Sequence, residues 1–217
     1  GSNDGGADAF LDFSVEAGNP QPLFELESVV EERGMGLTLT TNLPRSTAAC
    51  LALPFQNPPC EDADEDGLVD AWESLVLHRF RPMIRFDESE PFVDDGEGVL
   101  HAIGRVAVAP ESQMVIQVYI TLAFSRDYGR CGLGAHVGDS ERVVLELHAM
   151  SEDRGDVRVH KMYTAAHENT LIDHGTRLEG DELALATFIP DPDSGEPRWL
   201  IYASDGKHAM YPTIELC

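Results

Sequence analysis

The sequence predicts a mainly β protein: an antiparallel β-sandwich with a few short helices and one inserted acidic loop. After residue 99, stretches rich in Val, Ile, Leu and aromatic residues recur between Gly- and Pro-containing turns, as in all-β proteins. The chain has 217 residues, of which 42% are hydrophobic, which is enough for a sizeable core. No apolar run is long enough to cross a bilayer, so no transmembrane segment is expected.

Residues 1–20 are expected to form a flexible leader, because few bulky apolar residues precede Pro20. The first two residues, Gly1-Ser2, are typical of the remnant of an expression tag. Residues 21–217 are expected to form a single β-sandwich domain. Within it, a short helix is expected over 23–35 and an alternating strand over 36–41. Turn residues separate six further expected strands, over residues 99–109, 115–124, 141–150, 157–163, 183–188 and 199–203.

Residues 62–73 match the twelve-residue EF-hand calcium loop at each position that supplies a ligand. Gly67 stands at position six, where the loop turns sharply, and Val69 at position eight. Hard oxygen ligands and high negative charge favour Ca²⁺ over zinc. The alternative is a solvated acidic loop before a helix, since carboxylates stabilise helix N-termini. The expected ligands are the side chains of Asp62, Asp64, Asp66, Asp70 and Glu73 and the backbone carbonyl of Leu68.

A helix is expected to leave this loop and to run to about residue 80, so that loop and exit helix together cover 62–80. On the other side of the loop, Pro54, Pro58 and Pro59 oppose a regular helix. The sequence therefore predicts one EF-hand-like loop with one helix, and a structural cross-link rather than a calcium switch.

A second group of ligand-type residues lies between residues 127 and 141, at the start of the strand expected over 141–150. Alternation places Asp139 and Glu141 on the same face as the apolar residue Val143. Two desolvated like charges are unfavourable unless something neutralises them, and a divalent cation would do so. His136 is near enough in sequence to join it, and Asp127 is a further possible ligand in the same stretch. The alternatives are pairing with buried arginines or a solvated strand end.

The net charge of −24 and the pI near 4.4 disfavour nucleic acid as a partner. Four cysteines permit two disulfides, and the even count favours an oxidising compartment. Cys50 and Cys60 flank a Pro-rich loop and are natural partners, which would leave Cys131 for Cys217. Three pairings are open, and four free thiols are the alternative. We expect a secreted, extracellular or cell-surface protein, a lipoprotein included, whose signal has been removed.

Several segments resemble the vacuolar-protein-sorting-62-like family. Residues 134–143 are similar to its H-x-G-D-W-E-x-V motif, and residues 199–212 to its V-Y-x-S-x-x-G-H-A-x-Y-P segment. Residues 80–87 and 159–167 are similar to two further stretches of that family. The H-x-x-D-x-E spacing also resembles the necrosis- and ethylene-inducing-like cytolysins, in which an Asp before a Gly-Leu-Gly turn joins the cation site. Ser140 and Ala166 depart from the family pattern, where Trp and Ser stand.

The resemblance implies a divalent-cation site made by Asp127, His136, Asp139 and Glu141, with His167 and His208 nearby at one end of a sandwich. The ion could be Ca²⁺, Mg²⁺, Mn²⁺ or Zn²⁺. The first expected function is recognition of lipid or glycan head groups through this ion, as in a cytolysin or lectin. The second is a metal-dependent hydrolase of a phosphoester or glycoside, with His167 or His208 as catalytic acid or base. The third is a calcium-stabilised structural surface module.

Overall fold

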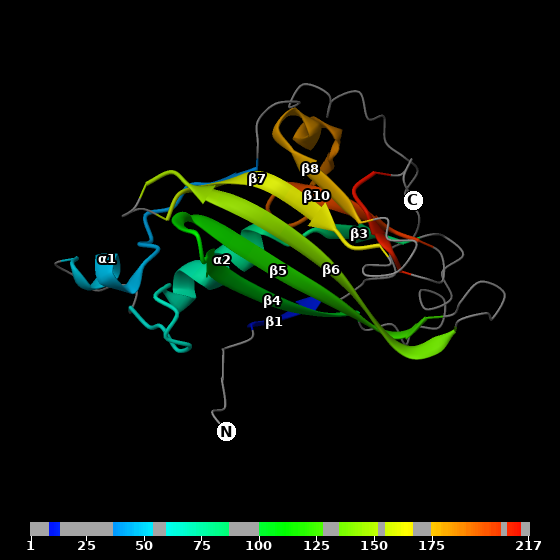
Figure 1. Ribbon diagram of the computed structural model, residues 1–217, viewed down its shortest axis with the longest axis horizontal. Helices are drawn as coiled ribbons and strands as arrows, with labels where there is room; N and C mark the ends of the chain where they lie inside the picture. Colours follow the sequence, from blue (N-terminus) through cyan, green and yellow to red (C-terminus); the bar gives the residue numbers. More distant parts are fainter. Residues whose placement is uncertain are drawn as a thin grey trace.

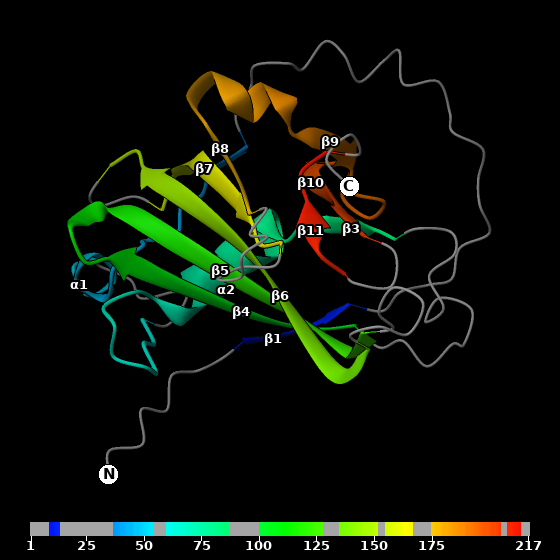
Figure 2. The same ribbon diagram turned by 45° about the vertical axis from the view of Figure 1, so that its right-hand side comes forward.

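The computed structural model describes residues 9–13, 37–53, 60–86, 100–127, 135–151, 155–166, 175–204 and 208–213. Within these ranges the protein is mainly β, and its largest element is a curled antiparallel sheet (Figures 1 and 2). The mainly β prediction is therefore confirmed. None of the helices in the described ranges is long and apolar enough to cross a membrane.

The large sheet has the strand order β1-β4-β5-β6-β7-β2, with β8 paired to β7. Its centre is the hairpin of the two longest strands, β5 and β6, whose shared end projects beyond the neighbouring strands (Figure 2). All neighbours in this sheet run antiparallel. The strands are β1 (Ala9–Phe13), β2 (Thr38–Leu39), β4 (Leu100–Ala109), β5 (Ser112–Asp127), β6 (His136–Ala149), β7 (Val157–Thr164) and β8 (Thr176–Glu179).

Strand β6 shows the alternation that the sequence predicts. Val143, Leu145 and Leu147 are fully buried, whereas Arg142 on the opposite face is exposed. This period of two arises because successive side chains of a strand point to opposite faces. The buried face packs on α2 (Asp70–Phe80), which lies across the sheet (Figure 1). One side of the large sheet therefore forms the core and the other meets solvent.

Helix α2 is held against the sheet at two glycines. A Cβ atom at Gly104 would lie 2.6 Å from Leu77 Cδ2, so the helix approaches β4 only because that side chain is missing. Trp72, also fully buried, donates a hydrogen bond from Nε1 to the carbonyl of Gly155 at 3.0 Å. The helix ends where Arg81 turns to an extended conformation. The shorter helix α1 (Thr47–Leu51) begins at Ser46, whose hydroxyl accepts a hydrogen bond from the Ala49 amide.

A second, smaller sheet contains β11, β10 and β3, with β9 paired to β10. Its strands are β3 (Met83–Arg85), β9 (Thr187–Pro190), β10 (Pro197–Ala203) and β11 (Met210–Tyr211), and the β3–β10 pair is parallel. Buried residues of β10 and β11, such as Trp199 and Met210, belong to the same apolar core as α2 and the large sheet. The two sheets therefore share one core.

Two expectations about the chain need correction. The strand expected over 183–188 is a 3-10 helix, Gly180–Leu185, followed by β9 from Thr187. Gly180 adopts a positive φ of 57°, and exposed residues after it, including Leu185, offer no continuous apolar face for a sheet. The segment expected as a flexible leader contains β1, whose backbone pairs with the edge of β4. The helix expected over 23–35 lies outside the described residues.

Candidate metal centres

The acidic loop at residues 62–73 turns sharply through two left-handed backbone positions, Glu65 at φ 59° and Gly67 at φ 92°. Glycine adopts this conformation without steric cost, which explains its place at the turn. The Asp62 carboxylate organises the loop from within. Its Oδ1 accepts from the Asp66 amide at 3.1 Å, and its Oδ2 accepts from the Gly67 amide at 3.0 Å.

The side chains of Asp62, Asp64 and Asp66 converge, with one ligand-type oxygen of each within 4.8 Å of the others. Asp64 Oδ1 and Asp66 Oδ2 are buried, and no group in the described part of the chain donates a hydrogen bond to either. Buried polar atoms are almost always satisfied, so two orphaned carboxylate oxygens in one loop are unusual. A cation in the centre of the loop would satisfy both.

Asp70 and Glu73, the two other acidic residues expected as ligands, lie in the first turn of α2. Asp70 Oδ1 accepts from the Ala63 amide at 3.0 Å, which closes the loop. Burial, followed by repulsion from Asp66 and Asp64, raises the pKa of Glu73 to about 8. The charges of the other loop carboxylates therefore act on the Glu73 carboxyl group. Glu73 does not belong to the group of ligand atoms within 4.8 Å, which consists of Asp62, Asp64 and Asp66.

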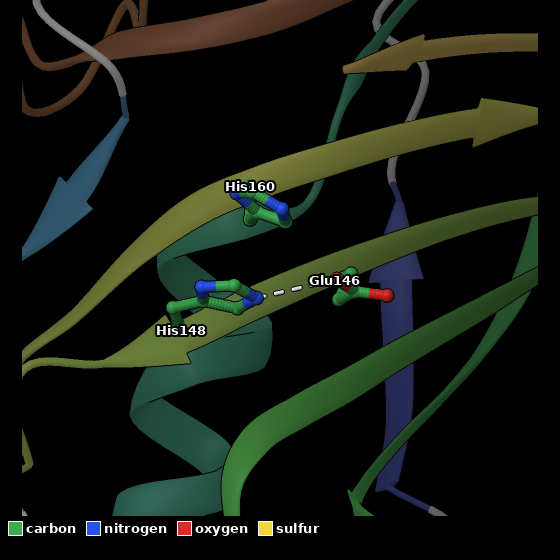
Figure 3. Close-up of side chains that lie close together, drawn as sticks. All are labelled: Glu146, His148 and His160. Atoms are coloured by element: carbon green, nitrogen blue, oxygen red, sulfur yellow. Dashed lines mark hydrogen bonds and ion pairs between the residues drawn. The ribbon is translucent and has the colours of Figure 1, made fainter. Parts of the chain in front are cut away.

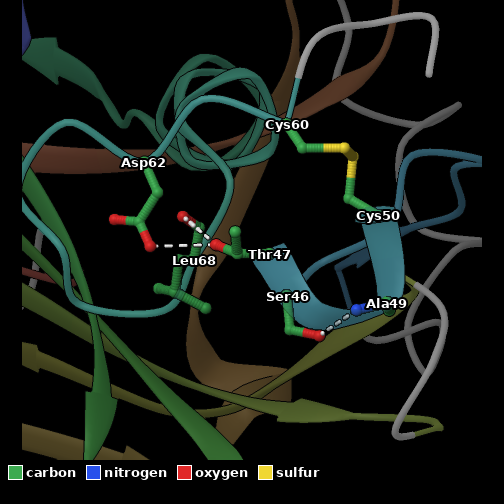
Figure 4. The surroundings of a disulfide bond; sticks show 7 residues. All are labelled: Ser46, Thr47, Ala49, Cys50, Cys60, Asp62 and Leu68. Carbon is green, nitrogen blue, oxygen red and sulfur yellow. Dashed lines mark hydrogen bonds between the residues drawn. A yellow bond between two sulfur atoms is a disulfide. The ribbon is translucent and has the colours of Figure 1, made fainter. Parts of the chain in front are cut away.

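The loop is joined to the preceding segment by three kinds of contact (Figure 4). Ser46 and Leu68 form an isolated antiparallel β-bridge. The Thr47 hydroxyl donates to Asp62 Oδ2 at 2.9 Å and lies 3.4 Å from the Leu68 carbonyl oxygen. The disulfide between Cys50 and the cysteine at position 60 ties the end of α1 to the start of the loop, as expected from the sequence.

Sequence reasoning missed Thr47, because no spacing rule links it to a loop fifteen positions further along. Its contact with Asp62 depends on the β-bridge, which is a tertiary feature. A Thr directly after the helix-capping Ser46 carries no signal of its own.

The second group of carboxylates lies at the end of the β5–β6 hairpin. In the strand register, Asp139 stands opposite Phe124, and Glu141 opposite Leu122. Asp139 and Glu141 are half-buried, and Asp127, at the last position of β5, is only 4% exposed. Asp139 and Glu141 therefore lie at the rim of the sheet on its apolar side, whereas the alternation of β5 assigns Asp127, three residues after Phe124, to the same rim on the other face. We call Asp127, Asp139, Glu141 and His208 the rim site.

His208 reaches the rim site from the turn between β10 and β11. Hydrogen bonds between Ser204 and the backbone of residues 208 and 209 close this turn, and His208 adopts a positive φ of 56°. Its ring is 1% exposed, stacks on Phe124 with centroids 4.0 Å apart, and places Nδ1 3.3 Å from Asp139 Oδ2. A non-glycine residue in the left-handed region stores strain of about 1–3 kcal/mol, which is common at functional sites.

In the absence of a cation, the carboxyl groups of the rim site repel one another. Burial, followed by repulsion from Asp139, raises the pKa of Glu141 to about 8, and Asp127 adds to the rise. His208 and Arg142 oppose it but do not cancel it. Proton uptake by Glu141 is therefore one way to relieve the repulsion, and a divalent cation is another.

Part of the predicted set lies outside the described residues. The backbone of His136 pairs with that of Asp127, but its side chain is outside the description. The same holds for all of His167, Cys131 and Cys217. The structure thus brings His208 into contact with Asp139 and places Glu141 within reach of the charges of both. Among the described residues, no three ligand atoms of the rim site lie within 4.8 Å of one another, so the cation site and its other expected members stay predictions.

No family model, curated protein or solved structure matches this chain. The resemblance to vacuolar-protein-sorting-62-like proteins and to the cytolysins therefore stays a prediction, carried by the motifs in the sequence.

Proposed function

We propose that residues 62–73 are an EF-hand-type calcium loop and that the protein binds Ca²⁺ there. The observation that carries this proposal is the pair of buried, unpartnered oxygens, Asp64 Oδ1 and Asp66 Oδ2, inside a ring of three aspartates. Oxygen-only surroundings of high negative charge suit Ca²⁺. The β-bridge, the disulfide and α2 give the loop a rigid frame, so the ion stiffens the fold rather than opening it.

Calorimetric titration of the EDTA-stripped protein with Ca²⁺ tests this proposal. We expect a calcium site that is lost in Asp64→Asn and Asp66→Asn and kept in Asp193→Asn, while calcium binding at the rim site should survive all three substitutions. Asp193 makes a matched control, because it is an exposed aspartate outside both clusters. Unchanged calcium binding in Asp64→Asn would contradict the proposal.

We also propose that a second divalent cation occupies the rim site and that the protein uses it to bind oxygen-rich head groups of lipids or glycans. The specific support is the contrast between buried and exposed groups. Asp127 and His208 are buried, while neighbouring Val137 is 89% exposed and Gly138 and Ser140 are exposed too. A cation bound by carboxylates on the buried side of the rim would be accessible to solvent on its other side. There an oxygen of a ligand could complete its coordination.

The same cation would reduce the repulsion between this acidic chain and anionic head groups. The hydrolase alternative has less support, because the His208 ring is stacked and buried rather than open to a substrate. The disulfide favours an oxidising compartment, so we propose a secreted or surface location. We further propose that the two sheets face each other as a β-sandwich, supported by their common core.

Binding to vesicles of phosphatidylcholine with or without an anionic lipid, and to a glycan array, tests the head-group proposal. We expect binding with Ca²⁺ or Mn²⁺ that disappears with EDTA and in Asp139→Asn, but survives in Asp64→Asn if the latter still folds. Folding is checked by circular dichroism. Metal-dependent binding that is equal in Asp139→Asn and the wild type would exclude the rim site. Absence of any metal-dependent binding would refute the recognition function.

A further inference from the structure

A third cluster of ligand-type side chains lies on the outer face of the large sheet, away from both candidate centres. Glu146 and His148 stand two residues apart on β6, and His160 stands on β7 (Figure 3). One ligand atom of each lies within 4.8 Å of the others. All three side chains are half-buried, so the cluster is packed against its neighbours on one side and accessible to solvent on the other.

A β-bulge creates this cluster. Glu146 pairs with Lys161 and Leu147 pairs with Val159, so His160 is an extra residue in β7. Val159 is buried, whereas His160 and Lys161 are both half-buried on the outer side, and the chain returns to the core at the next residue. Bulges re-aim side chains and are over-represented beside functional sites. Here the bulge presents two consecutive side chains to the same face.

The two outward residues meet different partners. The rings of His160 and His148 stack with centroids 3.8 Å apart and an interplanar angle of 22°. Lys161 Nζ lies 3.1 Å from Glu146 Oε1, and His148 Nε2 lies 3.3 Å from the same oxygen. A carboxylate oxygen, an imidazole nitrogen and an ammonium group thus share one small volume.

We propose that Glu146, His148 and His160 bind a transition-metal ion of borderline softness such as Zn²⁺, and that Lys161 takes the place of the ion on Glu146 in its absence. Two imidazoles and one carboxylate form a ligand set that zinc accepts, with further positions for water. Ca²⁺ and Mg²⁺ prefer oxygen ligands, so this site selects a different class of metal from the acidic loop.

One observed distance suits a small ion. Zinc bonds of about 2.0–2.1 Å in a tetrahedron place neighbouring ligand atoms about 3.3 Å apart. The separation of His148 Nε2 and Glu146 Oε1 is 3.3 Å. This separation is that of a hydrogen bond, and it equals the spacing that two zinc ligands need, so these two atoms would have to move little to bind an ion.

Two adjustments complete the site. A metal ion lies in the plane of each imidazole that binds it, and two stacked rings cannot both meet that condition, so the histidine rings must turn apart. Lys161 must also leave Glu146. Both moves are open, because the His148 and Lys161 side chains are 39% and 33% exposed. The proposal therefore predicts unstacking of the two rings as well as binding.

Zinc titration of protein saturated with Ca²⁺ tests the proposal, since calcium fills the oxygen-rich sites. The readouts are the affinity and the imidazole ¹⁵N resonances of His148 and His160. We expect both rings to shift together. Loss of an outer partner of a metal ligand typically costs 10–100-fold in affinity, so His160→Gln and His148→Gln should each weaken this site by at least about 100-fold.

Lys161→Met provides the opposite change. A partly exposed ion pair is weak, so removal of the competing ammonium group should tighten zinc binding by up to about fivefold. Asp139→Asn serves as a control and should leave these resonances and this affinity unchanged. Zinc binding that shifts neither ring, or that survives His148→Gln and His160→Gln undiminished, would overturn the proposal. Absence of zinc binding at millimolar concentration would overturn it equally.

Discussion

Replacement of Glu73 by glutamine should have opposite effects on the stability of the metal-free protein and on its calcium affinity. Burial and four surrounding aspartates raise the pKa of Glu73 from 4.5 to about 8. The stabilisation that comes with its protonated form is complete below pH 4.5 and is lost as pH rises through about 8. In EDTA, the wild type should therefore lose stability between pH 5 and pH 8.5.

The size of this loss follows from the same values. A rise in pKa from 4.5 to about 8 would correspond to about 5 kcal/mol for a carboxyl shielded from water. Glu73 is half-exposed, so solvent screening reduces this, and we expect about 2 kcal/mol. For a chain of this length, that difference corresponds to about 4–8 °C in melting temperature. Glu73→Gln, which stays neutral, should not show the loss.

Thermal unfolding in EDTA at pH 5 and pH 8.5 measures the first effect. The variant should match the wild type at pH 5 and exceed it by about 4–8 °C at pH 8.5. Calorimetric titration measures the second effect, and the loss of a bidentate ligand should weaken Ca²⁺ binding by at least about tenfold. A variant that is no more stable than the wild type at pH 8.5, or that keeps its calcium affinity, would refute the assignment of Glu73 to the loop.

Other predictions concern the cross-links of the fold and the rim. The double substitution Cys50→Ala and Cys60→Ala removes the cross-link that restricts the unfolded chain. It should lower the free energy of unfolding by about 3 kcal/mol, measured by urea unfolding. Trp72→Phe leaves the buried Gly155 carbonyl without its donor and should cost about 1–3 kcal/mol; a loss below about 0.5 kcal/mol would mean that this hydrogen bond is unimportant. Glu141→Gln should reduce the loss of stability that the metal-free protein shows in EDTA between pH 5 and pH 8, because burial and Asp139 raise the pKa of Glu141 to about 8. Thermal unfolding at the two pH values measures this change.

The sequence predicted those parts of the fold that depend on local pattern. The alternation in β6 placed Val143 and Leu145 inside and Arg142 outside, because the period of a strand is fixed by its geometry. The helix expected to leave the acidic loop and to run to about residue 80 is α2, Asp70–Phe80. Strand pairing was harder: β1 joins the sheet through its backbone, and backbone hydrogen bonds leave little trace in composition.

The candidate sites divide along the same line. The acidic loop was visible because its ligands are close in sequence and follow a fixed spacing. The meeting of His148 with His160 was not visible, because it depends on one extra residue in β7 and hence on the register of two strands. His208 was suggested by a resemblance, but its stacking on Phe124 is a property of the folded core alone.

The two glycines under α2 set a limit on how the molecule can respond to its ions. A Cβ atom at Gly155 would lie 2.5 Å from Trp72 Nε1, just as one at Gly104 would collide with Leu77. Side chains of α2 are thus in direct contact with the backbone at Gly155 and at Gly104. Sliding or rotation of the helix would make one of these two contacts collide. Binding of an ion to the acidic loop should therefore change the stability of the protein and leave the position of α2 on the sheet unaltered.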